Sequence, residues 1–176
     1  MSRDPFAREP QRVTIAATRV ALPYAPAAAW IGAVCGTATT AGALLPLLTD
    51  GDRGAVIGRL ARGTVAADVV ASALYEALRT AVPELAWWET YRLLALSAQP
   101  SPAGRMLLAG LDPWQLPVAA WCYALYELMT QNASERDRFR FDAQLKTPPP
   151  EADGDDFGDM DFDQMVAAAR STPGMG

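Results

Sequence analysis

The clearest pattern in the chain is a stripe of apolar positions between residues 64 and 82, spaced as on one face of a helix. Apolar side chains recur there at every third or fourth residue: Ala66, Val69, Val70, Ala73, Leu74, Ala77 and Leu78. This spacing predicts an amphipathic helix that buries one face in the core. Thr64 is a suitable cap for its start, and Pro83 ends it.

Helical signals also mark the segments on either side of this stripe. Alanine-rich residues 27–48 predict one or two helices that end in a turn over residues 49–52, and a short helix over 52–61 closes at Gly63. Further helices are predicted over 84–98, 103–109, 117–131, with Pro117 at its first position, and 134–146, with Ser134 as its cap. Residues 13–22 alternate weakly and predict one short strand or extended segment. The expected fold class is mainly α, a helical bundle of about six to seven helices.

Charge divides the chain into a nearly neutral body and an acidic end. The 176 residues carry a net charge of −5. Beyond Pro150 there is one base, Arg170, against seven acids, which are Glu151, Asp153, Asp155, Asp156, Asp159, Asp161 and Asp163. That segment therefore carries −6 and the remainder +1. We predict a flexible N-terminal arm over residues 1–12, a helical domain over 13–147 and a disordered acidic tail over 148–176.

Residues 20–49 contain no charged side chain, and such a run is long enough to span a bilayer. Its composition argues against a membrane span, because Leu and Ile are sparse and polar or helix-breaking residues interrupt it: Pro23, Pro26, Gly32, Gly36, Thr37, Thr39, Thr40, Gly42 and Pro46. Asp4 and Glu9 ahead of the run also disfavour a signal peptide. A membrane-associated helical protein is therefore the least favoured hypothesis.

The residue types that most catalytic and metal sites need are missing or badly spaced. The sequence has no histidine, the commonest general base and metal ligand. Cys35 and Cys122 lie in apolar stretches and are predicted to be reduced and buried, with a disulfide as the alternative. Calcium loops starting at Asp153 or Asp159 lack glutamate at the twelfth position, and no phosphate-binding glycine motif or Lys/Arg stripe occurs. We expect no enzyme activity, cofactor, metal site or nucleic-acid partner.

Aromatic residues are dense for a chain so rich in alanine. They either fill the core or form a partner-binding face. Trp87 and Trp88 would point about 100° apart on a helix, so one of them is expected to reach the surface, whereas Trp121 is expected in the core. The candidate partner-binding residues are Trp87, Trp88, Tyr91 and Trp114 in the body, and Phe157, Phe162 and Met165 in the tail.

An ordered set of motifs gives the chain a resemblance to a known family. The motifs are Leu47-Leu48-Thr49-Asp50, Trp87-Trp88-Glu89-Thr90-Tyr91-Arg92-Leu93, Gly110-Leu111-Asp112-Pro113, a helix with Trp121, and a charged helix ending in Pro148-Pro149-Pro150. Over residues 40–150 this order is similar to that of small helical proteins encoded among the tail genes of long-tailed actinobacterial phages. Those proteins are assigned as tail assembly chaperones.

The resemblance implies a protein that binds the long, hydrophobic tape-measure protein and keeps it soluble while tail-tube subunits assemble around it. It implies no catalytic residues and a location in the host cytoplasm during assembly. A groove near Trp87 and Trp88 would bind helical segments of the partner, and Phe157, Phe162 and Met165 would contact a second protein. The alternative is a structural virion component, such as a head–tail connector or a tail-tip protein. A homo-oligomer is compatible with both.

Overall fold

The computed structural model describes residues 11–97, 104, 106, 107, 110, 112 and 114–149. Within these ranges the protein is mainly helical, as the sequence predicted, with a short antiparallel sheet near the N-terminus. In chain order the elements are β1 (Gln11–Ile15), β2 (Thr18–Leu22), α1 (Ala27–Cys35), α2 (Thr40–Leu44), the 3-10 helix η1 (Leu45–Leu47), α3 (Asp50–Ala61), α4 (Ala67–Ala81), α5 (Trp87–Leu96), α7 (Val118–Thr130) and α8 (Glu135–Lys146).

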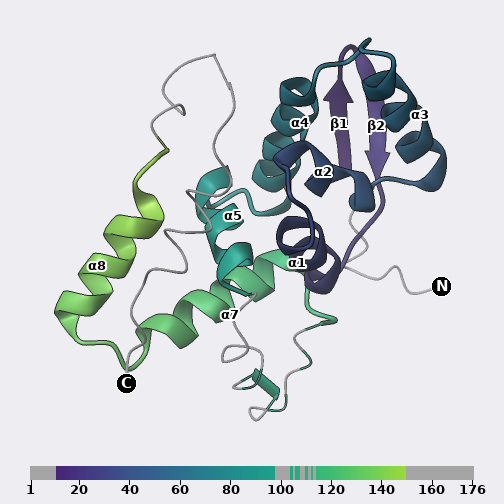
Figure 1. Ribbon diagram of the computed structural model, residues 1–176. Coiled ribbons are helices and arrows are strands. Elements are labelled where there is room, and N and C mark those ends of the chain that lie inside the picture. The colour runs from purple at the N-terminus through teal and green to yellow at the C-terminus, as the bar shows by residue number, and fades with distance from the viewer. Residues whose placement is uncertain are drawn as a thin grey trace.

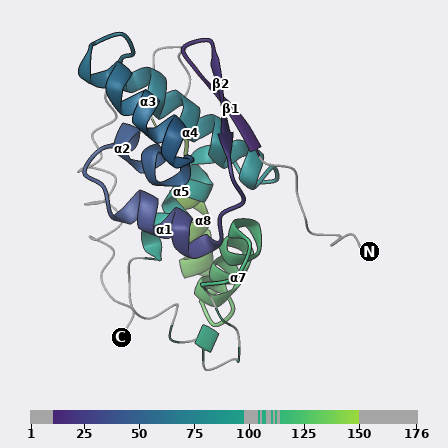
Figure 2. The ribbon, with the colours of Figure 1, turned by 90° about the vertical axis from the view of Figure 1, so that its right-hand side faces the viewer.

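The elements are arranged from one end of the molecule to the other. The hairpin of β1 and β2 lies at one end with α2, α3 and α4, while α1 and α5 lie in the middle (Figure 1). Helices α7 and α8 form the opposite end in the same view, and the view turned by 90° places α7 at the end away from α2 and α3 (Figure 2). Helix α4 packs against β1, α2 and α5, and α5 in turn packs against α1, α7 and α8. Helix α5 therefore connects the hairpin end to the α7–α8 end.

A turn of two alanines closes the N-terminal hairpin. Ala16 and Ala17 have φ values of 43° and 64°. Positive φ at both central residues gives a two-residue turn the twist that antiparallel strands need. The strands pair Val13 with Val20, and their inward side chains are buried: Val13, Ile15, Val20 and Leu22. The sequence predicted one short strand or extended segment over 13–22 and missed the division into two strands, because the turn lacks the Asn-Gly pair that usually marks such a hairpin.

Left-handed backbone conformations are costly for alanine, by about 1–2 kcal/mol per residue. We expect Ala17→Gly to raise the free energy of unfolding by about 1 kcal/mol, because glycine adopts positive φ without that cost. The matched control is Ala21→Gly within β2, which should lower the free energy of unfolding by about 0.5–1 kcal/mol. Urea unfolding followed by circular dichroism measures both variants. Equal signs for the two changes would contradict a strained turn.

Polar side chains cap the starts of three helices. Thr39 Oγ1 accepts from the Gly42 N–H (3.1 Å), Thr49 Oγ1 from the Asp52 N–H (3.3 Å), and Ser134 Oγ from the Asp137 N–H (3.2 Å). The cap at Ser134 agrees with the sequence prediction. Residues 49–52, predicted as a turn, are instead the cap and first turn of α3.

Two other predicted helix starts differ in the structure. Thr64 does not cap α4, because its Oγ1 donates to the Arg59 carbonyl at the end of α3 (3.1 Å), and α4 begins at Ala67. Pro117 is the residue before α7 rather than its first residue. It pairs with Pro26, the residue before α1, and the Ala27 N–H donates to the Leu116 carbonyl (2.8 Å). The starts of α1 and α7 are thus tied together.

The predicted apolar stripe and the uncharged run both contribute to the core. In α4 the stripe buries Val70, Ala73, Leu74, Ala77 and Leu78. The run over 20–49 becomes β2, α1, α2 and η1, whose buried side chains include Trp30, Ile31, Val34, Leu44 and Leu47. No helix in the described ranges combines the length and the apolar character that crossing a bilayer requires.

Trp121 on α7 is fully buried and anchors a small polar network. Its Nε1 donates to Ser97 Oγ (2.7 Å), and Ser97 Oγ donates to the Leu93 carbonyl of α5 (2.9 Å). The predicted core position of Trp121 is therefore confirmed. Of the predicted helix over 103–109, the structure describes Gly104, Met106 and Leu107, all in helical conformation.

Candidate protein-interaction surface

Two of the predicted partner-binding aromatics lie in the core. Trp87, at the start of α5, is 1% exposed and stacks on Tyr75 of α4 with ring centroids 3.8 Å apart. Tyr91, one turn later, is equally buried, and this burial raises the pKa of its hydroxyl. These two side chains join α5 to the rest of the core, so a partner-binding groove cannot be lined by either of them in this conformation.

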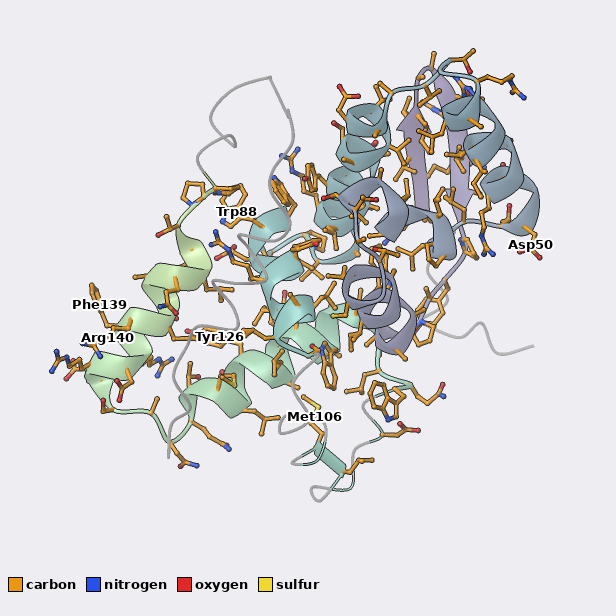
Figure 3. The ribbon with its side chains drawn as sticks, in the orientation of Figure 1. Asp50, Trp88, Met106, Tyr126, Phe139 and Arg140 are labelled. Atoms are coloured by element: carbon orange, nitrogen blue, oxygen red, sulfur yellow. The ribbon has the colours of Figure 1, made fainter. Side chains whose placement is uncertain are left out.

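Trp88 is the member of the tryptophan pair that reaches the surface. Its side chain is half-buried, and its ring meets that of Trp87 edge-on with centroids 5.8 Å apart. Its Nε1 donates to the Lys146 carbonyl at the end of α8 (3.4 Å). Trp88 therefore lies where α5 meets the C-terminal end of α8 (Figure 3).

Arg92 of α5 holds the same end of α8 through backbone carbonyls. Its Nη1 donates to the carbonyls of Gln144 (2.6 Å), Leu145 (3.0 Å) and Thr147 (2.6 Å). The last carbonyls of a helix have no partner within the helix and carry partial negative charge, so a cation there is favourable. Burial lowers the pKa of Arg92, and the nearby Glu89 opposes this shift. One side chain thus caps α8 and fastens it to α5.

The remaining contacts of α8 lie on one of its sides. Leu145 is the buried residue of this helix. The Tyr126 hydroxyl of α7 donates to Asp142 Oδ1 (2.7 Å), and the rings of Tyr126 and Phe141 lie 6.0 Å apart (Figure 3). Helix α8 is therefore docked by a short apolar contact and by polar bonds at defined atoms, rather than by a broad buried face.

The opposite side of α8 carries an exposed phenylalanine. Phe139 is 75% exposed, and it projects with Arg140 away from α5 and α7 (Figure 3). Residues three and four apart share a face of a helix, which groups Arg136, Phe139, Arg140 and Ala143, all of them exposed. We call these four residues the outer face of α8. Phe139 does not help to anchor α8 to the body as Phe141 does, because positions 139 and 141 lie on different sides of a helix.

The remaining predicted partner-binding residues lie outside α5 and α8. Trp114 belongs to the segment that follows α5 and precedes α7 in the chain; it is 43% exposed, and its backbone N–H donates to Asp112 Oδ1 (3.0 Å). Phe157, Phe162 and Met165 lie outside the described residues. Sequence reasoning did not select Tyr123, which is also exposed and donates from its hydroxyl to Glu84 Oε2 (2.7 Å).

The two cysteines differ in their surroundings, and neither forms a disulfide. Cys122 is buried as predicted, and this burial raises the pKa of its thiol to about 12. Cys35 is exposed, contrary to the prediction, because it is the last residue of α1; its thiol donates to the Leu94 carbonyl of α5 (3.5 Å). In the part of the chain that the structure describes, no group of three or more His, Cys, Asp or Glu side chains is placed to hold a metal ion.

Comparison of the chain with protein-family models, with curated proteins and with solved structures found no match. The distinguishing feature of the candidate surface is the outer face of α8, where the exposed Phe139 is flanked in the sequence by Arg136 and Arg140, on a helix whose C-terminal end is bound by Trp88 and Arg92.

Proposed function

We propose that the chain is a non-catalytic protein-binding domain that acts as a tail assembly chaperone of a long-tailed phage, present in the host cytoplasm during assembly. In this role it binds helical segments of the tape-measure protein through the outer face of α8. The observation that carries the proposal is the 75% exposure of Phe139 on a helix that is otherwise rich in charged residues. Large exposed aromatics flanked by arginine are typical anchors of protein interfaces.

The chemistry of the outer face suits an amphipathic helix as the partner. Helices dock by placing an apolar side against an apolar anchor, with contacts every third or fourth residue. Phe139 supplies that anchor, and Arg136 and Arg140 on either side of it can pair with carboxylates that flank the apolar side of the partner. Because apolar burial is not screened by salt, binding through Phe139 should persist at high ionic strength.

Several of the motifs that carry the resemblance lie at helix boundaries of this chain. Thr49 caps α3, the Trp87-Trp88 pair opens α5, and Gly110 adopts a φ of 78° before α7. Arg92, within the tryptophan motif, caps α8. The resemblance supports the proposal through the order of these motifs in the sequence, and the outer face of α8 supplies the proposed binding surface.

The test is co-expression of this chain with a long helical tape-measure protein, with soluble partner measured after centrifugation. We expect the full chain to increase soluble partner, and Phe139→Ser to lose most of that effect, because it removes the anchor without disturbing the core. Tyr24→Ser is the matched control, since Tyr24 is also a largely exposed aromatic (59%) but lies between β2 and α1. Equal solubility with and without the chain would contradict the proposal.

Mass spectrometry of purified particles distinguishes the proposed role from that of a structural virion component. A chaperone leaves the finished particle, so the chain should be far below stoichiometric amounts there. If the chain is present in stoichiometric amounts in the virion and has no effect on the solubility of the partner, its function is that of a structural virion component and not that of a chaperone.

A further inference from the structure

The outer face of α8 is basic as well as aromatic, and its charges are weakly engaged within the helix. Arg140 Nη1 lies 4.0 Å from Asp137 Oδ1, and the two side chains are 60% and 42% exposed. Ion pairs of such length and exposure contribute little to stability. The guanidinium of Arg140 therefore keeps the capacity to bind another carboxylate, and Arg136 lies on the same face one turn earlier.

The chain itself contains an acidic segment that follows α8 in the sequence. The described residues end at Pro149, three residues after α8, and residues 151–176 carry a net charge of −6. Phe157, Phe162 and Met165 stand between or beside the acids of that segment. A stretch that combines carboxylates with aromatic residues is complementary to a surface in which a phenylalanine lies between arginines.

Chain length allows this segment to reach the outer face. Phe139 precedes Lys146 by seven residues, which corresponds to about 11 Å along the helix axis. The eight steps from Pro149 to Phe157 can span up to about 26–29 Å when extended. Phe157 can therefore return along α8 as far as Phe139, and Phe162 and Met165 have still more chain available to them.

We infer that residues 151–176 bind the outer face of α8 in the same molecule, with carboxylates on Arg136 and Arg140 and an apolar side chain on Phe139. This contact rests on the proposed function only in its consequence, which is that the segment covers the partner-binding face until a partner displaces it. A tethered segment has an effective concentration in the millimolar range, so weak contacts suffice to cover the face. A partner with higher affinity still replaces the segment.

The contact can be measured in the full chain without any partner. A spin label is attached at Ser171→Cys in a Cys35→Ser background, where Cys122 stays unlabelled because it is buried and its thiol pKa is raised to about 12. We expect amide signals of Arg136–Ala143 to lose about half or more of their intensity, as the high effective concentration implies, and those of α3 to change little. Raising the ionic strength from about 0.1 M to about 1 M shortens the Debye length from about 10 Å to about 3 Å and should weaken the effect.

Two charge reversals provide a matched comparison. Arg140→Glu removes a cation from the outer face, whereas Arg138→Glu makes the same change in charge about 160° away around the helix. Arg140→Glu and Phe139→Ser should abolish most of the broadening, while Arg138→Glu should leave most of it. Equal effects of the two reversals, or no broadening above that of α3, would overturn the inference.

A mixed sample separates this contact from self-association. Spin-labelled chains without isotope are combined with isotope-labelled chains that carry no spin label. In this sample the spin label can broaden only the signals of another molecule. Broadening of α8 as strong as in the doubly labelled chain would therefore assign the outer face to a second copy and would overturn the intramolecular contact. Neither result depends on the tape-measure protein, so failure of this inference and failure of the proposed function are distinguishable.

Discussion

Replacing Trp121 by alanine should lower the free energy of unfolding by about 3–5 kcal/mol, the range for deleting a fully buried aromatic side chain. Trp121 is 0% exposed, and it joins α7 to α5 through Ser97. Alanine leaves a cavity between these helices and removes the donor to Ser97 Oγ. The free energy is measured by urea unfolding followed by far-UV circular dichroism, because fluorescence itself changes when a tryptophan is removed.

Trp121→Phe serves as the control for this result. Phenylalanine retains most of the apolar contact but cannot donate to Ser97 Oγ, which still donates to the Leu93 carbonyl. We expect a loss of about 1–2 kcal/mol, the combined cost of one hydrogen bond and a small cavity. A Trp121→Ala variant that loses no more than Trp121→Phe would mean that α7 repacks around the missing ring.

The adjacent tryptophans should respond differently to alanine. Trp87→Ala is expected to cost about 3–5 kcal/mol, since Trp87 is buried and stacks on Tyr75. Trp88→Ala should cost about 1–2 kcal/mol, because Trp88 is half-buried and its hydrogen bond to the Lys146 carbonyl is long at 3.4 Å. The same urea measurement compares the two variants. Equal losses would make Trp88 a core residue and remove it from the candidate interface.

Local sequence signals sufficed where one residue type decides a helix boundary or a face. The cap at Ser134 and the stripe of α4 are set by short-range hydrogen bonding and by helical periodicity, and both were predicted correctly. The hairpin was missed because its turn is made of Ala16 and Ala17, which carry no turn signal. Arg59, which donates to Thr18 Oγ1 (3.0 Å) and the Ala16 carbonyl (3.4 Å), supports that turn from α3, and sequence patterns do not reveal such a contact.

The outer face of α8 could not be predicted from the sequence. The density of aromatics drew attention to Trp87 and Trp88, and in the structure Trp88 and Arg92 contact the end of α8, whereas Phe139 was not among the predicted partner-binding residues. Which tryptophan is buried depends on the stacking of Trp87 on Tyr75, a tertiary contact with no local signature. The same holds for Phe139, whose exposure is fixed by the side of α8 that faces α5.

The attachment of α8 at its C-terminal end has a mechanical consequence. A pull on the chain beyond Pro149 reaches the Thr147 carbonyl first, and from there it passes through the Arg92 guanidinium into α5. Trp88 and the buried Leu145 resist in parallel at the same end. The load therefore enters α5 before it reaches the turns of α8 that carry Phe139, and those turns are joined to α7 through Tyr126 and Asp142. Tension on the chain end is thus transferred to the core at the junction after α8, and the exposed ring of Phe139 lies outside that path.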